Sequence, residues 1–208
     1  MPSPVTSIRP FAPGTSGWSA TDLEDPAISK LWDEGRFEII EGVLTNMPAA
    51  LYDGQKRLRR LTDVVETYLG KAGRPERFVF EVDLILSESR VPKADAVLMT
   101  PLDEQRQREA NKLHGRPDLE FGRILVPPTL LVESVSIGHE RHDRKLKRDW
   151  YAQAGIANYW IFDSYQRSLE CLVLDGNAYV VDQMATDDKD VRPSLFPGLL
   201  IPLKELWV

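Results

Sequence analysis

The sequence has few of the residues that most often build disulfides and transition-metal sites. Its 208 residues include one cysteine, Cys171, so neither an intramolecular disulfide nor a cysteine-based zinc site is possible. The three histidines, His114, His139 and His142, do not have the HExxH spacing of a metalloprotease. Candidate ligands for a metal ion are therefore the carboxylates.

Long apolar runs and an excess of positive charge are also missing. No run approaches the 18 apolar residues of a transmembrane helix, and residues 1–20 lack the apolar core of a secretory signal. These features predict a cytoplasmic protein that does not enter a membrane. The formal net charge of −6 argues against tight nonspecific binding to a polyanion, although local basic clusters can still bind phosphates.

The length suits one domain with a sizeable core. Residues 1–18 carry four prolines and are expected to form a disordered or loosely packed tail, with a single domain over 19–208. Residues 101–124 are polar without a clear period, so we expect a surface excursion there, such as a lid or an oligomer contact. Periodicity and turn signals predict helices over 21–34 (capped by Thr21), 53–70 and 142–154, and strands over 37–47 (a pair), 78–86, 91–99, 129–135, 168–174 and 178–184.

The strand predicted over 129–135 carries a carboxylate, Glu133, in the middle of an apolar run. A buried carboxylate costs several kcal/mol unless it is paired, hydrogen-bonded or bound to metal. The helix that follows offers a partner, because a helical wheel at about 100° per residue places Lys147 in the apolar arc with Trp150 and Tyr151. Lys145 falls on the solvent side. An alternative is that Lys147 only pairs with Asp143, one helical turn earlier.

A second carboxylate, Asp95, interrupts the apolar strand predicted over 91–99. It shares one face of that strand with Val97, as Glu133 does with Leu131 in its own strand. Two such carboxylates and an inward lysine suit a magnesium site that activates water and stabilises charge on a phosphoryl group. The alternative is a buried ionic network with a purely structural role.

Several motifs, taken in order, resemble the Uma2 type of endonuclease in the restriction-endonuclease-like PD-(D/E)xK superfamily. FEIIEG at 37–42 resembles the family's YELIDG, and ADAV at 94–97 resembles its RPDV. PTLLVESVS at 128–136 resembles PDLVVEVLS, and GIANYWIFD at 155–163 resembles GVPEYWLVD. The D-x3-K-x3-Y spacing is present as Asp143, Lys147 and Tyr151, and the segment from Phe196 resembles the family's closing segment.

This resemblance implies an α/β fold: a restriction-endonuclease-like mixed β-sheet core flanked by helices, with additional antiparallel strands. It implies Asp95 and Glu133 as ligands of Mg²⁺ (or Mn²⁺) and Lys147 as the catalytic lysine. Val135 stands where a standard ExK motif has its lysine. Glu38, Asp143 and Tyr151 are the residues expected to support this site.

The function expected from this resemblance is metal-dependent hydrolysis of phosphodiester bonds in DNA. The alternatives are a catalytically degenerate protein that binds nucleic acid or serves in assembly, and a hydrolase acting on RNA or another phosphodiester. The basic cluster at 55–60 supplies candidate phosphate contacts in Lys56, Arg57 and Arg60, and the alternative is that the cluster is only a solvated helix face. Analogy with the family also suggests a homodimer.

Overall fold

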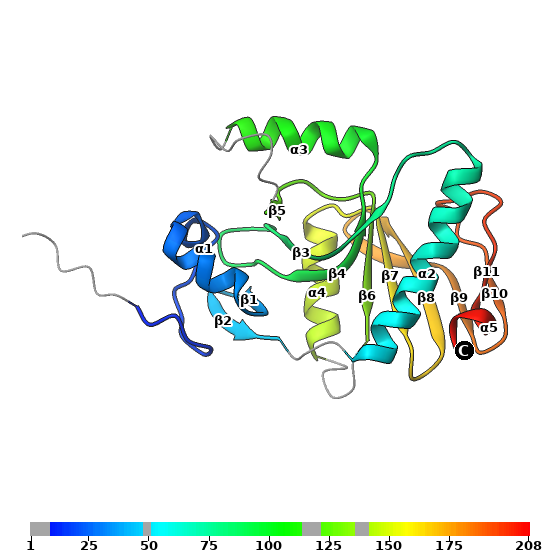
Figure 1. Cartoon of the computed structure of the whole chain (residues 1–208), viewed down its shortest axis with the longest axis horizontal. Coiled ribbons are helices and arrows are strands. Elements are labelled where there is room, and N and C mark those ends of the chain that lie inside the picture. The colour runs from blue at the N-terminus through cyan, green and yellow to red at the C-terminus, as the bar shows by residue number, and fades with distance from the viewer. Residues whose placement is uncertain (1–8, 48–50, 114–121, 136–141) are drawn as a thin grey trace, which may run out of the picture.

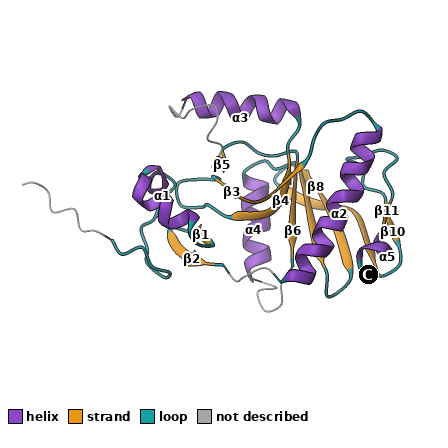
Figure 2. Cartoon of the chain, in the orientation of Figure 1, coloured by secondary structure: helices purple, strands orange, loops and turns teal. Residues whose placement is uncertain are grey.

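The structure is a computed structural model that describes residues 9–47, 51–113, 122–135 and 142–208, without the side chains of 142–144. Seven strands form one mixed sheet in the order β5-β3-β4-β6-β7-β8-β9, with helices packed on it (Figures 1 and 2). Its strands are β3 (Phe78–Leu84), β4 (Lys93–Leu98), β5 (Arg123–Ile124), β6 (Leu130–Ser134), β7 (Asn158–Asp163), β8 (Ser168–Asp175) and β9 (Ala178–Thr186).

Strands β6 and β7 are parallel and are connected by α4 (His142–Gln153), whereas β4–β6, β7–β8 and β8–β9 are antiparallel pairs. The strand predicted over 129–135 and the helix predicted over 142–154 are thus observed as β6 and α4. Gly176, which has a positive φ, and Asn177 form the turn of the β8–β9 hairpin, directly after the strand residue Asp175.

Alternate residues of the central strands face two separate cores. Leu130 and Val132 of β6 pack with α2 (Tyr52–Lys71), whereas Leu131 packs with Tyr151 of α4. Helices α2 and α4 therefore cover opposite faces of the sheet (Figure 1). The C-terminal segment, with β11 (Ile201–Pro202) and α5 (Leu203–Leu206), joins the α2 side through residues that are fully buried, and β11 pairs with β10 (Asp190–Val191).

A smaller N-terminal unit has its own core and reaches back to the sheet. It contains the 3-10 turn η1 (Thr21–Glu24), α1 (Pro26–Asp33) and the hairpin of β1 (Phe37–Ile40) with β2 (Val43–Asn46). The helix predicted over 21–34 thus divides in two. Asp25, not Thr21, caps α1, since its side chain accepts from two backbone N–H groups and Pro26 occupies the first helical position.

Residues 9–18 lie within the segment predicted as a tail, and they contact the hairpin. Trp18 is buried, and Ser16 forms a bridge with Val43. That a single domain extends over residues 19–208 stays a prediction. Within the part of the chain that the structure describes, no helix is long and apolar enough to cross a membrane.

A role of the polar segment 101–124 as a lid or an oligomer contact stays a prediction. Among its described residues this segment forms a regular helix, α3 (Pro101–Leu113). Its buried positions are Asp103, Gln107 and Asn111, spaced four residues apart. The helix therefore has a regular period, but the buried stripe is polar and a search for apolar periodicity misses it.

Candidate active site

Neighbouring strands bring Asp95 and Glu133 together. Strands β4 and β6 are antiparallel with Ala96 opposite Val132, so the next step along this register places Asp95 opposite Glu133. The backbone N–H of Ser134 donates to Oδ2 of Asp95 over 2.7 Å, and the two carboxyl groups are in hydrogen-bonding contact. The sequence pattern predicts only which residues of its own strand each carboxylate lies beside. The register shows that both carboxylates lie on the same face of the sheet.

Burial raises the pKa of both carboxyl groups. The pKa of Glu133 rises from 4.5 to about 8, because desolvation and the negative charge of Asp95 outweigh the attraction of the Lys147 ammonium. The pKa of Asp95 is also raised by burial, against the opposing effect of the Ser134 hydrogen bond. At neutral pH the pair therefore retains a proton, as two adjacent carboxylates do when no cation neutralises them.

The β1–β2 hairpin supplies a third carboxylate, Glu38, which is 3% exposed. The hairpin joins the sheet through a bridge between Ile39 and Val91, just before β4. Oε1 of Glu38 accepts from the backbone N–H of Lys93 at 2.8 Å and from Nζ of Lys147 at 2.7 Å. Through Oε1, Glu38 therefore links Lys147 of α4 to the backbone at the start of β4.

Helix α4 directs Lys147 and Tyr151 into the same group, as the helical wheel indicates. Lys147 is 7% exposed, and its Nζ lies 4.0 Å from Oε1 of Glu133. The hydroxyl of Tyr151 donates to the same Glu133 oxygen at 2.5 Å. Lys145 is exposed, and the side chain of Asp143 lies outside the described residues, so a pair between Asp143 and Lys147 is not tested.

The donor chemistry of this group fits a hard divalent cation. Asp95 and Glu133 present oxygen ligands, and Mg²⁺ commonly binds through one or two carboxylates and completes its shell with water. Burial raises the pKa of both groups because it takes the carboxylates out of water, and a bound cation can compensate for this as a proton does. Among the described residues, no set of three or more His, Cys, Asp or Glu side chains is arranged to hold a metal. The fit is therefore to a site of two carboxylates.

The proposed nucleic-acid residues lie on α2, on the other face of the sheet. Lys56 is exposed, whereas Arg57 donates to the backbone carbonyl of Ser164 at 3.2 Å. Ser164 follows β7, and β7 is parallel to β6, so Arg57 lies at the same end of the sheet as Glu133. Nη1 of Arg60 is buried and has no hydrogen-bond partner in the described part of the chain.

Sequence reasoning missed one charged pair beside the candidate site, between Arg36 and Glu81. Nη1 of Arg36 lies 2.5 Å from Oε1 of Glu81, and the Arg36 guanidinium opposes the rise in the pKa of Asp95. Arg36 directly precedes the FEIIEG motif, which is the one local signal that could have indicated it.

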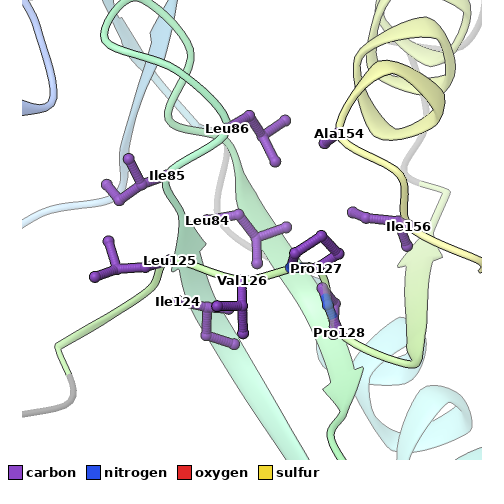
Figure 3. A pocket seen from close by; sticks show the side chains of 10 residues that line it. All are labelled: Leu84, Ile85, Leu86, Ile124, Leu125, Val126, Pro127, Pro128, Ala154 and Ile156. Atoms are coloured by element: carbon purple, nitrogen blue, oxygen red, sulfur yellow. The ribbon is translucent and has the colours of Figure 1, made fainter. Parts of the chain in front are cut away.

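An apolar cavity of about 110 Å³ lies elsewhere on the α4 side of the sheet (Figure 3). Leu84 and Leu86 of one wall face Ala154 and Ile156 of the other, and no ionisable side chain lines it. Val126 and its neighbours, which precede β6, form the remaining wall, so the cavity lies at the opposite end of β6 from Glu133. It therefore contributes no group to the carboxylate cluster.

The mixed sheet, the helices on its two faces and the carboxylates on its central strands define a protein with a nuclease-like α/β fold. A family model described as "Uma2: Putative restriction endonuclease" matches residues 27–204, and the chain belongs to this family. The resemblance seen in the sequence is thereby confirmed.

One solved structure supports the fold. The crystal structure of "a putative nuclease belonging to DUF820" from Anabaena variabilis ATCC 29413 is 17% identical with a TM-score of 0.62, covering 84% of this chain and 90% of that chain. The cryo-EM structure of a DrdV–DNA complex is 16% identical with a TM-score of 0.30, covering 65% of this chain and 12% of that chain, and this likeness carries no argument. No curated protein matches the chain.

Proposed function

We propose that this protein is a metal-dependent endonuclease that hydrolyses phosphodiester bonds of DNA. The observation that carries the proposal is the convergence of Asp95 and Glu133 from adjacent strands, with Lys147 from α4 placed 4.0 Å from Glu133. Membership of the restriction endonuclease family supports the reaction class. Perturbed pKa values at such a cluster are typical of functional sites.

In this proposal Asp95 and Glu133 hold Mg²⁺ or Mn²⁺. When bound, such a cation polarises a phosphoryl oxygen and lowers the pKa of a water ligand. Lys147 supplies a positive charge that stabilises the negative charge developing on the attacked phosphate. Glu38 keeps the Lys147 ammonium in place, and Tyr151 fixes the orientation of the Glu133 carboxyl group.

DNA is proposed to reach this site along the end of the sheet that carries Glu133. Lys56 and Arg57 at the start of α2 are then available as phosphate contacts, with Arg60 one turn further. Because such contacts release counterions, Lys56→Glu should weaken binding and reduce the dependence of affinity on salt concentration. An affinity that does not change with Lys56→Glu would remove this surface from the proposal.

A binding or assembly role without catalysis is the second candidate. One observation favours it: Val135 occupies the position of the lysine in a standard ExK motif. Hydrolysis of RNA is a variant of the first candidate and uses the same residues.

A cleavage assay tests the proposal. The substrates are supercoiled DNA, single-stranded DNA and RNA, each with Mg²⁺, with Mn²⁺ and with EDTA. We expect cleavage of DNA only with metal, and none with Asp95→Asn. An Asp63→Asn variant serves as the matched control, since Asp63 is an exposed carboxylate on α2. Metal-dependent cleavage by Asp95→Asn at the wild-type rate would contradict the assignment, and inactivity of the wild type on every substrate would favour the second candidate.

A homodimeric state and a cytoplasmic location are also proposed, both from analogy with the family and from the sequence. Size-exclusion chromatography with light scattering measures the first, and a mass of about 24 kDa, that of one chain, would contradict it.

A further inference from the structure

The ion pair of Arg36 and Glu81 lies beside the cluster formed by Asp95, Glu133 and Glu38. The register of β3 and β4 passes from Phe80–Ala96 to Val82–Ala94, so Glu81 lies opposite Asp95, at a point where the two strands do not pair. Arg36 directly precedes β1, two residues before Glu38. The pair therefore adjoins both Asp95 and Glu38.

The backbone at Glu81 has a conformation that L-residues rarely adopt, with φ at +51°. Such a residue inside a strand ends the regular ladder locally and redirects the side chain. Here the redirected carboxylate binds Nη1 of Arg36. Unusual backbone geometry of this kind is enriched at functional sites, where the surrounding structure holds it in place.

Arg36 has a hydrogen-bond donor that the ion pair with Glu81 does not use. Its Nε is buried and has no hydrogen-bond partner among the residues that the structure describes. Its side chain is nevertheless 27% exposed, and that of Glu81 is 40% exposed, so solvent reaches the pair. A guanidinium offers five N–H donors in a planar fork that matches a phosphate group.

We propose that Arg36 binds a backbone phosphate of the nucleic acid, and that Glu81 is the intramolecular partner which this phosphate displaces. This proposal takes from the proposed function only the class of ligand, a nucleic acid. It adds a substrate-binding residue and an acidic residue that competes with the substrate.

Replacement of Glu81 by a phosphate at Arg36 is electrostatically reasonable. In the free protein Glu81 neutralises the charge of Arg36 next to a site that holds three carboxyl groups and one lysine. A phosphodiester brings an equal charge and accepts hydrogen bonds at two free oxygens, so it can replace Glu81. Glu81 in turn weakens binding of any anion that does not displace it.

A double-mutant cycle measured by DNA binding tests this inference. Labelled duplex and single-stranded DNA, and an RNA of the same sequence, are titrated in EDTA, where no cleavage interferes. We expect Arg36→Gln to weaken binding about five- to tenfold and to lower the slope of affinity against salt by about one. Glu81→Gln should strengthen binding several-fold, and this gain should vanish when Arg36→Gln is also present.

The pair of Arg90 and Glu41 provides matched controls. Its side chains are 28% and 49% exposed, and Arg90 stacks on Trp150 and donates to Gln153, toward the C-terminal end of α4. Arg90→Gln and Glu41→Gln should change affinity less than about twofold, since exposed charges away from the phosphate contribute little. Thermal melts establish that every variant is folded, and Arg36→Met, which also removes the charge, replaces Arg36→Gln if the latter is not.

Three results would overturn the inference: wild-type affinity for Arg36→Gln, an equal gain from Glu81→Gln in both backgrounds, or no binding of DNA or RNA by the wild type at low salt. Binding that follows the expected cycle supports Arg36 whether or not the protein cleaves DNA with metal. The failure of this inference is thus distinguishable from the failure of the endonuclease proposal.

Discussion

Lys147 is held in place by a carboxylate that comes from a distant part of the chain. Glu38 and Lys147 are both almost fully buried and lie 2.7 Å apart. Two buried ions of opposite charge stabilise one another, but removing one leaves the other without compensation in a medium of low dielectric constant. The stability of the fold and the position of the proposed catalytic charge therefore depend on the same contact.

Replacing Lys147 should affect both rate and stability. We expect Lys147→Met to reduce any metal-dependent cleavage by at least about 10²-fold, the usual effect of losing one preorganised charge. It should also lower the free energy of unfolding by about 3 kcal/mol, because Glu38 loses its cation. Urea denaturation and the cleavage assay measure the two effects.

Two variants separate these effects. Glu38→Gln combined with Lys147→Met should regain much of the stability and none of the rate. Lys145→Met should change stability by less than about 0.5 kcal/mol and leave the rate unchanged, since Lys145 is exposed. If Lys145→Met is the inactive variant, the assignment of Lys147 is wrong.

Glu133 makes stability depend on pH. Its pKa is about 8 in the folded protein against an ordinary value of 4.5, so between these values the folded state retains a proton that the unfolded chain releases. The stabilisation is complete below about pH 4.5 and is lost as pH rises to about 8. The raised pKa of Asp95 acts in the same direction.

Thermal melts in EDTA from pH 5 to 9 measure this dependence. We expect the melting temperature of the wild type to fall across this range and that of Glu133→Gln to fall less. Glu205→Gln, a change at an exposed carboxylate of α5, should behave as the wild type does. Identical pH profiles for Glu133→Gln and the wild type would show that Glu133 does not hold the proton.

At the scale of elements, α3 shows a helix attached to the sheet by polar contacts. The side-chain amide of Gln107 accepts from the backbone N–H of Leu125 and donates to the carbonyl of Arg123. It thus satisfies backbone groups beside the edge strand β5. Asp103 accepts in addition from the hydroxyls of Thr100 and Thr129.

Gln107→Leu should destabilise the protein by about 2 kcal/mol, because it leaves two backbone groups of the β5 segment without partners. Gln105→Leu, two positions earlier on the exposed side of α3, should cost less than about 0.5 kcal/mol. Urea denaturation gives both values. Faster hydrogen exchange at Leu125 in Gln107→Leu alone would localise the effect, and equal stability of the two variants would contradict it.

The elements that the sequence predicts well are those with an apolar stripe. Strand β6, helix α4 and the inward direction of Lys147 follow from period and polarity alone. Helix α3 does not, because its buried stripe is made of Asp103, Gln107 and Asn111. A sequence pattern therefore identifies the buried face of a helix or strand only when that face is apolar.

At the scale of the whole molecule, the candidate site is an assembly of three remote segments. The β1–β2 hairpin, the β4–β6 pair and α4 meet at one end of the sheet. The sequence indicates Asp95, Glu133 and Lys147 as separate exceptions to apolar patterns, and the family resemblance relates them. The sequence does not indicate that Glu81 lies opposite Asp95 or that Arg36 reaches Glu81. Strand register and the positive φ of Glu81 are not local properties of the sequence.

The central claim is that Asp95 and Glu133 together hold a divalent cation, and calorimetry tests it most directly. Mg²⁺ and Mn²⁺ are titrated at pH 7 into the wild type, Asp95→Ala and the control Asp63→Ala, in buffers that differ in ionisation enthalpy. We predict that the wild type and Asp63→Ala bind the cation and release a proton as they do, because the carboxyl pair is protonated beforehand. Asp95→Ala should lose both signals. Binding of either cation by Asp95→Ala with wild-type affinity would contradict the account.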